Sequence, residues 1–187
     1  MSTAAVIIIL IVGVLALLVF YVIGVYNKLV NARNKVENQF SQVDIQLKRR
    51  ADLIPNLVET VKGYAKHEEG TFKAVVEARS KAVNANTINE KVEANNELTG
   101  ALTKLFALAE AYPDLKANEN FLKLQEDLKD TEDKITYARQ FYNDSAMSFN
   151  NLVQMFPSNI VANMFGFKKY DYFKIAEEEK EVPEVKF

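Results

Sequence analysis

The feature that most constrains this chain is a long apolar segment near its N-terminus. From Ala4 to Val25, about 22 consecutive residues carry no charged side chain. As a helix, this segment would extend roughly 33 Å, enough to cross a hydrocarbon core of about 30 Å. A cleaved secretory signal is the alternative, but such signals have a shorter apolar core that follows basic residues. Tyr21 and Tyr26 lie near the far end, where amphipathic rings favour lipid headgroups. The sequence therefore predicts a transmembrane anchor over residues 1–25.

Basic residues beside this segment predict its orientation. No Lys or Arg precedes the segment, whereas Lys28, Arg33 and Lys35 follow it. Basic flanks are retained on the cytoplasmic side of a membrane, so we expect the C-terminal domain in the cytoplasm and a short N-terminus outside. The absence of cysteine from the sequence fits either compartment.

The charge of the remaining chain limits the classes of partner. The chain has 187 residues, with 23 Lys and Arg against 25 Asp and Glu, and residues 177–187 are rich in glutamate. Charges before that tail nearly balance, whereas nucleic-acid-binding domains normally carry a basic surplus. We therefore expect no nucleic acid partner, one helical domain over residues 26–176, and an acidic tail over residues 177–187.

Helical periodicity continues directly beyond the apolar segment. Residues 26–50 place apolar side chains at helical spacing, namely Leu29, Val36, Phe40, Val43 and Leu47. Pro55 lacks the amide proton that a helix interior uses, and proline is favoured in a first helical turn. We therefore predict a turn in "RRADL", residues 49–53, and a second helix over residues 55–83. One continuous helix with a kink at Pro55 is the alternative.

Two further helices are indicated by periodicity and by their end signals. The third covers residues 88–111 and ends before Pro113, and the fourth covers residues 119–154, capped by Asn118 and closed by Pro157. The sequence shows no strand-type alternation of apolar and polar residues. The predicted fold class is therefore all-α, with an N-terminal transmembrane helix followed by an antiparallel four-helix bundle.

Two long segments resemble a known protein family. They are "YNKLVNARNKVENQFSQVDIQLKRRADLIPNLVETVKGYAKHE" and "ARQFYNDSAMSFNNLVQMFPSNIVANMFGFKKYDYF". They resemble the N-terminal and C-terminal signatures of LemA family bacterial membrane proteins, with a close match over residues 26–79 and 137–173 and a loose match between. The resemblance implies a single-pass protein of the bacterial cell (inner) membrane with a helical-bundle domain. It implies no established activity, cofactor or substrate.

The sequence offers few residues for catalysis or cofactor binding. A di-iron site in a helical bundle needs Glu-x-x-His motifs, but the one histidine, His67, follows Tyr64 at that spacing. Phosphotransfer by His67 is an alternative, although the lysine that often adjoins the glycine in such domains is missing beside Gly70. A carboxylate pair is the remaining enzymatic alternative. We expect no enzyme and no catalytic, cofactor-binding or metal site, because the chain lacks cysteine and any glycine-rich phosphate loop.

Charged residues interrupt the apolar faces of the predicted helices. They are Arg33, Asp44, Glu68, Arg79 and Arg139. Buried charges are costly unless paired, so these residues predict a polar network between helices. The alternative is that they reach solvent from the edge of the apolar face. If the first two predicted helices fold back about Ala51, apolar positions face each other and Arg33 faces Glu68.

A basic and aromatic segment follows the fourth predicted helix. Its residues of interest are Phe156, Ile160, Met164, Phe165, Phe167, Lys168 and Lys169. Four helices that alternate in direction would return this segment to the membrane end of the domain. Apolar and basic side chains at that place suit a membrane surface or a partner protein. Aromatic side chains that close the base of the bundle are the alternative.

The expected function is a single-pass, membrane-anchored helical scaffold or interaction protein of the bacterial cell envelope. Its expected partners are the lipid bilayer and an unidentified protein, and a homo-oligomer is compatible with the sequence. The alternative is a sensory or regulatory bundle that transmits a signal through the anchor helix.

Overall fold

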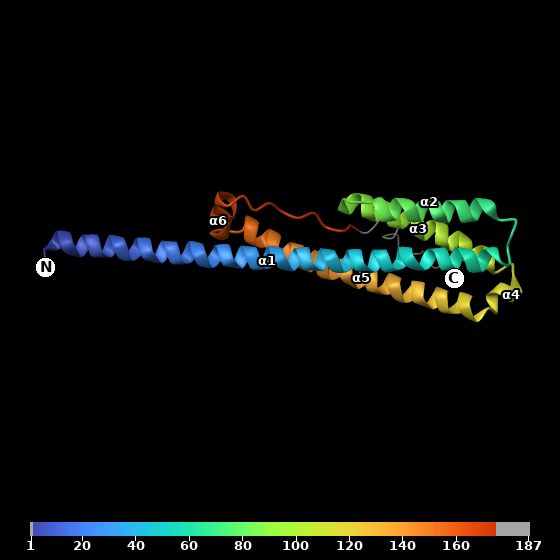
Figure 1. Ribbon diagram of the computed structural model, residues 1–187. Coiled ribbons are helices and arrows are strands. Elements are labelled where there is room, and N and C mark those ends of the chain that lie inside the picture. The colour runs from blue at the N-terminus through green and yellow to red at the C-terminus, as the bar shows by residue number, and fades with distance from the viewer. Residues whose placement is uncertain (1, 175–187) are drawn as a thin grey trace, which may run out of the picture. The chain divides into compact units, whose positions relative to one another are not determined.

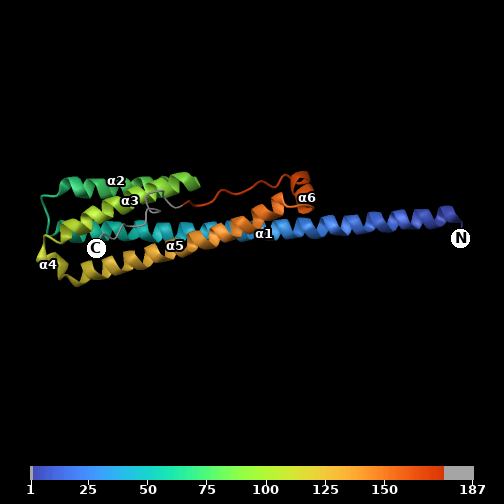
Figure 2. The same cartoon turned by 180° about the vertical axis from the view of Figure 1, so that it is seen from behind.

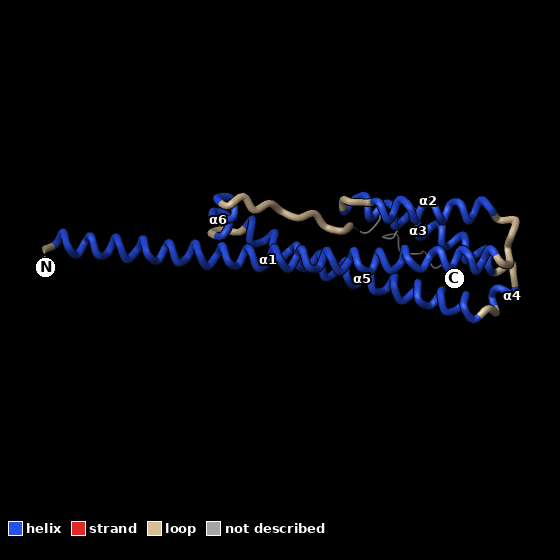
Figure 3. Tube along the Cα trace, in the orientation of Figure 1, coloured by secondary structure: helices blue, strands red, loops and turns tan. Residues whose placement is uncertain are grey.

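The computed structural model describes residues 2–174, which form helices and connecting segments without any strand (Figure 1). The helices are α1 (Thr3–Lys62), α2 (Glu69–Asn84), α3 (Ile88–Ala109), α4 (Pro113–Lys116), α5 (Glu119–Gln154) and α6 (Ser158–Met164). The all-α class predicted from the sequence is confirmed over this range (Figure 3). The predicted acidic tail, residues 177–187, lies outside the described residues.

The chain divides into two compact units. Of the described residues, the first unit contains those up to Gln39 together with Asn143–Asp171, and the second contains Phe40–Tyr142 and residues 172–174. Both α1 and α5 therefore contribute residues to each unit.

Apolar side chains from α1, α2, α3 and α5 share one core in the second unit. This core includes Ile54, Leu57, Val61, Phe72, Val75, Leu98, Leu102, Leu105, Phe121 and Leu128. Most neighbouring members on one helix lie three or four residues apart, the spacing that places them on a single face. Removing each such side chain from water contributes about 1.5–3 kcal/mol to stability. Burial of these faces is what holds the helices of the second unit together.

The predicted break before Pro55 is wrong, because α1 continues through it to Lys62. Residues 49–53 are helical rather than a turn, so the alternative of one continuous helix is correct at this point. The fold-back about Ala51 therefore does not exist, and the pairing of Arg33 with Glu68 that depended on it is also wrong. The chain first leaves helical structure between Gly63 and Glu68, and α2 begins at Glu69.

A distant arginine accounts for the continuity of α1. Proline at position 55 cannot donate a hydrogen bond to the carbonyl four residues earlier, which belongs to Ala51. In the structure Arg79 of α2 donates from its Nε to that carbonyl oxygen at 2.7 Å. The acceptor that Pro55 leaves without a helical partner is thus satisfied from the next helix, and the missing amide does not end the helix.

The ends of α3 and α5 are set by local capping. Thr87 and Glu90 form a capping box: the Thr87 side chain accepts from the Glu90 amide, and the Glu90 carboxylate accepts from the Thr87 amide. The Asn118 Oδ1 accepts from the Phe121 amide at 3.0 Å, which confirms the predicted cap of the last long helix. The predicted spans of these two helices agree with α3 and α5 within two residues at each end.

The first unit begins with the apolar part of α1. Over the described residues, α1 is the one helix with the length and apolar composition needed to cross a membrane. Its side chains from Val6 to Phe20 are largely exposed, whereas Leu29 and Val36 farther along are fully buried. The change from exposed to buried apolar residues on α1 therefore falls just beyond the segment predicted to span the membrane.

Candidate functional site

The segment that follows α5 exposes an unusual set of apolar side chains. The exposed fractions are 79% for Phe156, 58% for Ile160, 60% for Met164 and 50% for Phe165. Val161 and Ala162 of the same short helix, α6, are buried in contrast. The exposed apolar positions on α6, Ile160 and Met164, are four residues apart, which places them on one side of the helix, and the exposed Asn163 precedes Met164. We call Phe156, Ile160, Met164 and Phe165 the α6 apolar face.

Aromatic contacts attach this segment to the part of α1 that follows the apolar stretch. The ring of Tyr26 lies 4.8 Å from that of Phe165 and 5.9 Å from that of Phe167, between ring centroids. Phe167 also contacts Phe149 of α5 at 6.1 Å, and the Arg33 guanidinium lies 5.6 Å from its centre. Such ring pairs each contribute about 0.5–1.5 kcal/mol beyond the burial of their area. α6 and α1 accordingly lie side by side in the first unit (Figure 1 and Figure 2).

A glycine turn directs the chain from α6 toward these rings. Gly166 has φ of 72°, a left-handed conformation that favours glycine. The amide of Gly166 donates to the carbonyl of Asn163 at 3.2 Å, and that of Phe167 donates to the carbonyl of Ala162 at 3.0 Å. This pair of bonds ends α6 in a Schellman motif. The turn thereby separates exposed Phe165 from half-buried Phe167.

Asn150 holds the extended chain that follows. Its side chain, only 2% exposed, accepts from the Tyr170 amide and donates to the Tyr170 carbonyl, each at 2.9 Å. The Tyr170 hydroxyl donates to Glu37 at 3.2 Å, and Glu37 also pairs with Arg33 at 3.7 Å. Burial raises the pKa of the Tyr170 phenol, and the Glu37 carboxylate raises it further. These contacts fix the backbone on the C-terminal side of the exposed Lys168 and Lys169.

The sequence-predicted surface residues therefore divide into two groups. Phe167 packs among rings, as expected for an aromatic plug, while the α6 apolar face remains exposed. Sequence reasoning missed Asn150 and Tyr170. The signal was present for Asn150, which directly follows Phe149 on the buried side of α5 and is polar there.

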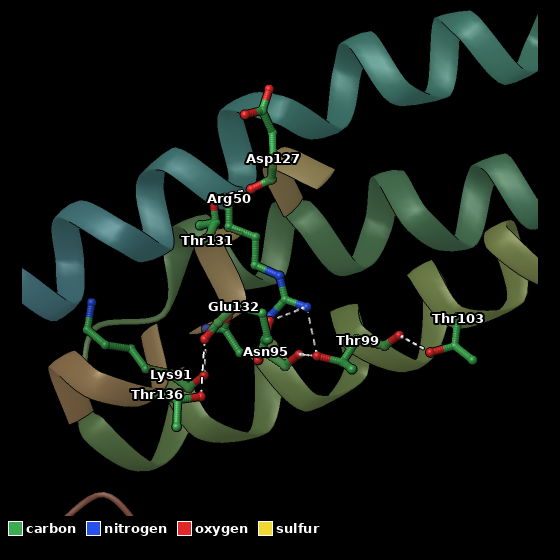
Figure 4. Close-up of polar contacts among 9 residues, drawn as sticks. All are labelled: Arg50, Lys91, Asn95, Thr99, Thr103, Asp127, Thr131, Glu132 and Thr136. Atoms are coloured by element: carbon green, nitrogen blue, oxygen red, sulfur yellow. Dashed lines mark hydrogen bonds and ion pairs between the residues drawn. The ribbon is translucent and has the colours of Figure 1, made fainter. Parts of the chain in front are cut away.

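A second polar cluster lies in the second unit and centres on Arg50 (Figure 4). Arg50 is 4% exposed, and its Nη2 donates to Thr99 Oγ1 at 2.8 Å and pairs with Glu132 at 3.0 Å. Burial lowers the pKa of the Arg50 guanidinium, and Glu132 opposes that shift. Buried Asn95 and Thr131 bond backbone carbonyls one turn earlier on their own helices. Arg50 was not predicted to be buried, because residues 49–53 were expected to form a turn before Pro55.

The residues of the predicted polar network have the following partners. Arg33 contacts Glu37 and Phe167, Asp44 pairs with Lys91 at 2.9 Å, and Arg139 lies over the ring of Phe173. Arg79 bonds the Ala51 carbonyl, and the Glu68 carbonyl accepts from the amides of Thr71 and Phe72. Arg33, Asp44 and Arg79 are thus held by partners outside the predicted set. Within residues 2–174, no group of three or more His, Asp or Glu side chains is arranged to hold a metal ion.

These features define a class: an all-α protein whose first helix carries an apolar segment of membrane-spanning length. The chain belongs to the LemA family, whose sequence model matches residues 39–187, as the resemblance predicted. It is 28% identical to Protein LemA of Metamycoplasma hominis, over 84% of this chain and 70% of that protein. It is 26% identical to the magnetosome protein MamQ of Magnetospirillum gryphiswaldense, over 79% of this chain and 64% of that protein. The chain thus spans less than two thirds of the length of this MamQ relative.

Proposed function

We propose that this protein is a single-pass, membrane-anchored helical scaffold that presents its domain to a protein partner. The observation that carries the proposal is the continuity of α1. The helix that contains the apolar segment also supplies Ile54, Leu57 and Val61 to the core of the second unit. A helix cannot both cross a bilayer and contribute to that core unless the domain stands at the membrane. In this proposal the four long helical segments of the domain form an antiparallel bundle on the cytoplasmic side of the inner membrane.

Several features support a scaffold over an enzyme. The buried polar groups of the Arg50 cluster bond one another or the backbone, an arrangement that sets how helices pair. Exposed apolar side chains occur outside the apolar segment of α1, including Tyr137 and Phe141 on α5, where a partner could contact them. Three relatives carry the name magnetosome protein, and that name assigns them no catalytic activity.

The anchor is tested by extraction of bacterial membranes with alkaline carbonate. The full chain should remain in the membrane pellet, and a chain that lacks residues 2–25 should be released in larger part. Release of the full chain would contradict the single-pass anchor.

The partner is tested by photo-crosslinking in native membranes. A photoreactive phenylalanine analogue at Tyr137, which is 61% exposed, should give a discrete crosslinked band that mass spectrometry identifies. The matched control places the analogue at Tyr142, which is 1% exposed and on the same helix. Exposed positions Phe141 and Met147 extend the scan. A scan in which every exposed position gives only the uncrosslinked chain would refute the scaffold.

A sensory or regulatory domain is the second candidate, and the same continuity of α1 favours it. A signal could pass from the membrane to the Arg50 cluster because the apolar segment and Arg50 lie on one helix, α1. The test is whether an external cue changes the crosslinking yield at Tyr137 while the yield at Tyr142 stays constant.

A further inference from the structure

α6 exposes two large apolar side chains, Ile160 and Met164, beside the polar Asn163, and exposure of such side chains is unfavourable for a helix that faces water. Val161 and Ala162 are buried on one side, and the α6 apolar face is exposed on the other. A surface helix of a water-soluble domain normally turns polar residues outward. The exposed side of α6 instead resembles the apolar side of a helix that lies in the plane of a membrane interface. An apolar phase on this side of α6 would remove these side chains from water.

The position of α6 along α1 identifies that phase. Phe165, directly after α6, contacts Tyr26, one residue beyond the apolar segment predicted to end at Val25. Val22 and Val25 are partly buried, whereas Ile23 between them is exposed. Val22, Val25 and the fully buried Leu29 follow helical spacing, so one side of α1 is covered from Val22 onward. The first unit therefore begins to cover α1 within the last turn of the membrane-length segment.

Basic side chains occur near Tyr26 and near the residues that contact it. Lys28 lies two residues beyond Tyr26 on α1, and Lys168 and Lys169 follow Phe167, whose ring contacts Tyr26. All three lysines are exposed. Aromatic and apolar groups next to lysines match the layered chemistry of a membrane surface, where acyl chains give way to anionic headgroups. A protein partner would require no such alignment with the end of the apolar segment.

We propose that the α6 apolar face inserts into the interface of the same bilayer that α1 spans, with Lys168 and Lys169 at the headgroups. The ligand is the lipid surface itself, and this contact is a second attachment beside the anchor. The inference rests on the proposed anchor, because the level of α6 is defined by the end of the apolar segment. A second attachment on one side of α1 also fixes the rotation of that helix about its own axis.

The test uses the absence of cysteine from the sequence, which permits single-cysteine variants of the full chain. Ile160→Cys is labelled with an environment-sensitive fluorophore, and the protein is reconstituted in vesicles of phosphatidylglycerol and phosphatidylcholine. Lipids that carry a nitroxide quencher either near the headgroup (shallow) or near the end of the acyl chain (deep) then report the depth of each label in the bilayer. Leu15→Cys serves as the deep reference, Tyr21→Cys as the shallow reference, and Tyr137→Cys as an exposed control on the second unit.

The expected result is blue-shifted emission at position 160 and a loss of fluorescence to the shallow quencher close to that at position 21. The label at position 137 should show neither change. A second outcome is that lipid quenches the label at position 15, while the label at position 160 responds as weakly as the label at position 137. That outcome would overturn the inference and leave the anchor intact. No loss at position 15 would instead overturn the anchor. A blue shift at 160 without lipid quenching would mean that protein covers the α6 apolar face, which also overturns the inference. Met164→Cys replaces Ile160→Cys if circular dichroism shows that the latter does not fold.

Discussion

At the scale of single residues, the guanidinium of Arg50 is buried in the second unit, and this burial carries a desolvation cost. A charge that leaves water must recover its hydration from fixed partners, and Arg50 finds two, Thr99 and Glu132. Exposed ion pairs of the same unit have no comparable penalty to offset. Lys81 and Glu97, for example, pair at 2.6 Å but remain in contact with solvent. Burial, and not distance, therefore decides which pair matters for stability.

The first prediction compares these two pairs. Glu132→Gln should lower the free energy of unfolding by about 1–3 kcal/mol, because it leaves the Arg50 charge buried with weaker compensation. The value lies below that of a fully buried pair because the Glu132 side chain is 42% exposed. The matched variant Glu97→Gln should change stability little, since water replaces the lost partner. Urea unfolding in mild detergent, followed by circular dichroism, measures both, and equal losses would contradict the argument.

At the scale of helices, the course of α1 depends on a contact that no local pattern reveals. Pro55 removes one donor, and Arg79, from another helix, supplies a replacement to the Ala51 carbonyl. The rule that proline interrupts a helix assumes that the freed carbonyl stays without a partner or that the chain bends. Here a side chain from another helix bonds the freed carbonyl instead. For that reason the predicted turn at residues 49–53 is wrong.

The second prediction tests this compensation with a double-mutant cycle. Arg79→Met should lower the free energy of unfolding by about 1.5–3 kcal/mol, the usual contribution of a hydrogen bond to a charged group. In a Pro55→Ala background the new amide can bond the Ala51 carbonyl, so Arg79→Met should cost about 1 kcal/mol less. Lys73→Met, which removes an exposed lysine from the same helix, should cost the same in both backgrounds. An Arg79→Met penalty that is identical in both backgrounds would refute the compensation.

The helices that the sequence did predict share one property: their boundaries are set by neighbours in the chain. Asn118 and Thr87 each cap through the amide three residues away, and Pro113 and Pro157 lie just outside α3 and α5. The candidate site follows the same division. The apolar and basic composition of residues 156–169 was visible in the sequence, whereas the bonds of Asn150 to Tyr170 join residues twenty positions apart and were not.

At the scale of the whole molecule, the third prediction concerns orientation. Basic residues follow the apolar segment of α1 and none precedes it, so the domain should face the cytoplasm. In intact cells stripped of any outer membrane, a membrane-impermeant maleimide should label Ser2→Cys and should not label Glu126→Cys until the membrane is opened. The unmodified chain, which lacks cysteine, gives the background. Labelling of Glu126→Cys in intact cells would place the domain outside.

The last prediction separates the two membrane attachments from each other. A chain of residues 26–187 lacks the apolar segment but keeps the α6 apolar face and the adjacent lysines. If that face inserts into lipid, the truncated chain should still bind anionic vesicles, and binding should weaken with salt because headgroup attraction is screened. Transfer of a half-exposed apolar side chain contributes about 1 kcal/mol, so Phe156→Ser/Ile160→Ser/Met164→Ser together should lower the partition coefficient roughly 100-fold.

The matched control for this variant is Tyr137→Ser/Phe141→Ser, which removes two similarly exposed rings from the second unit. That variant should bind vesicles as the unsubstituted truncated chain does, because its rings lie away from the α6 apolar face along the sequence and on the other unit. Vesicle sedimentation measures partitioning, and circular dichroism checks that helical content is unchanged in each protein. Equal losses of vesicle binding in the two variants would indicate nonspecific adsorption through exposed apolar groups and would contradict insertion of the α6 apolar face. A loss confined to the α6 variant requires a specific apolar contact with lipid, since both proteins retain Lys168 and Lys169.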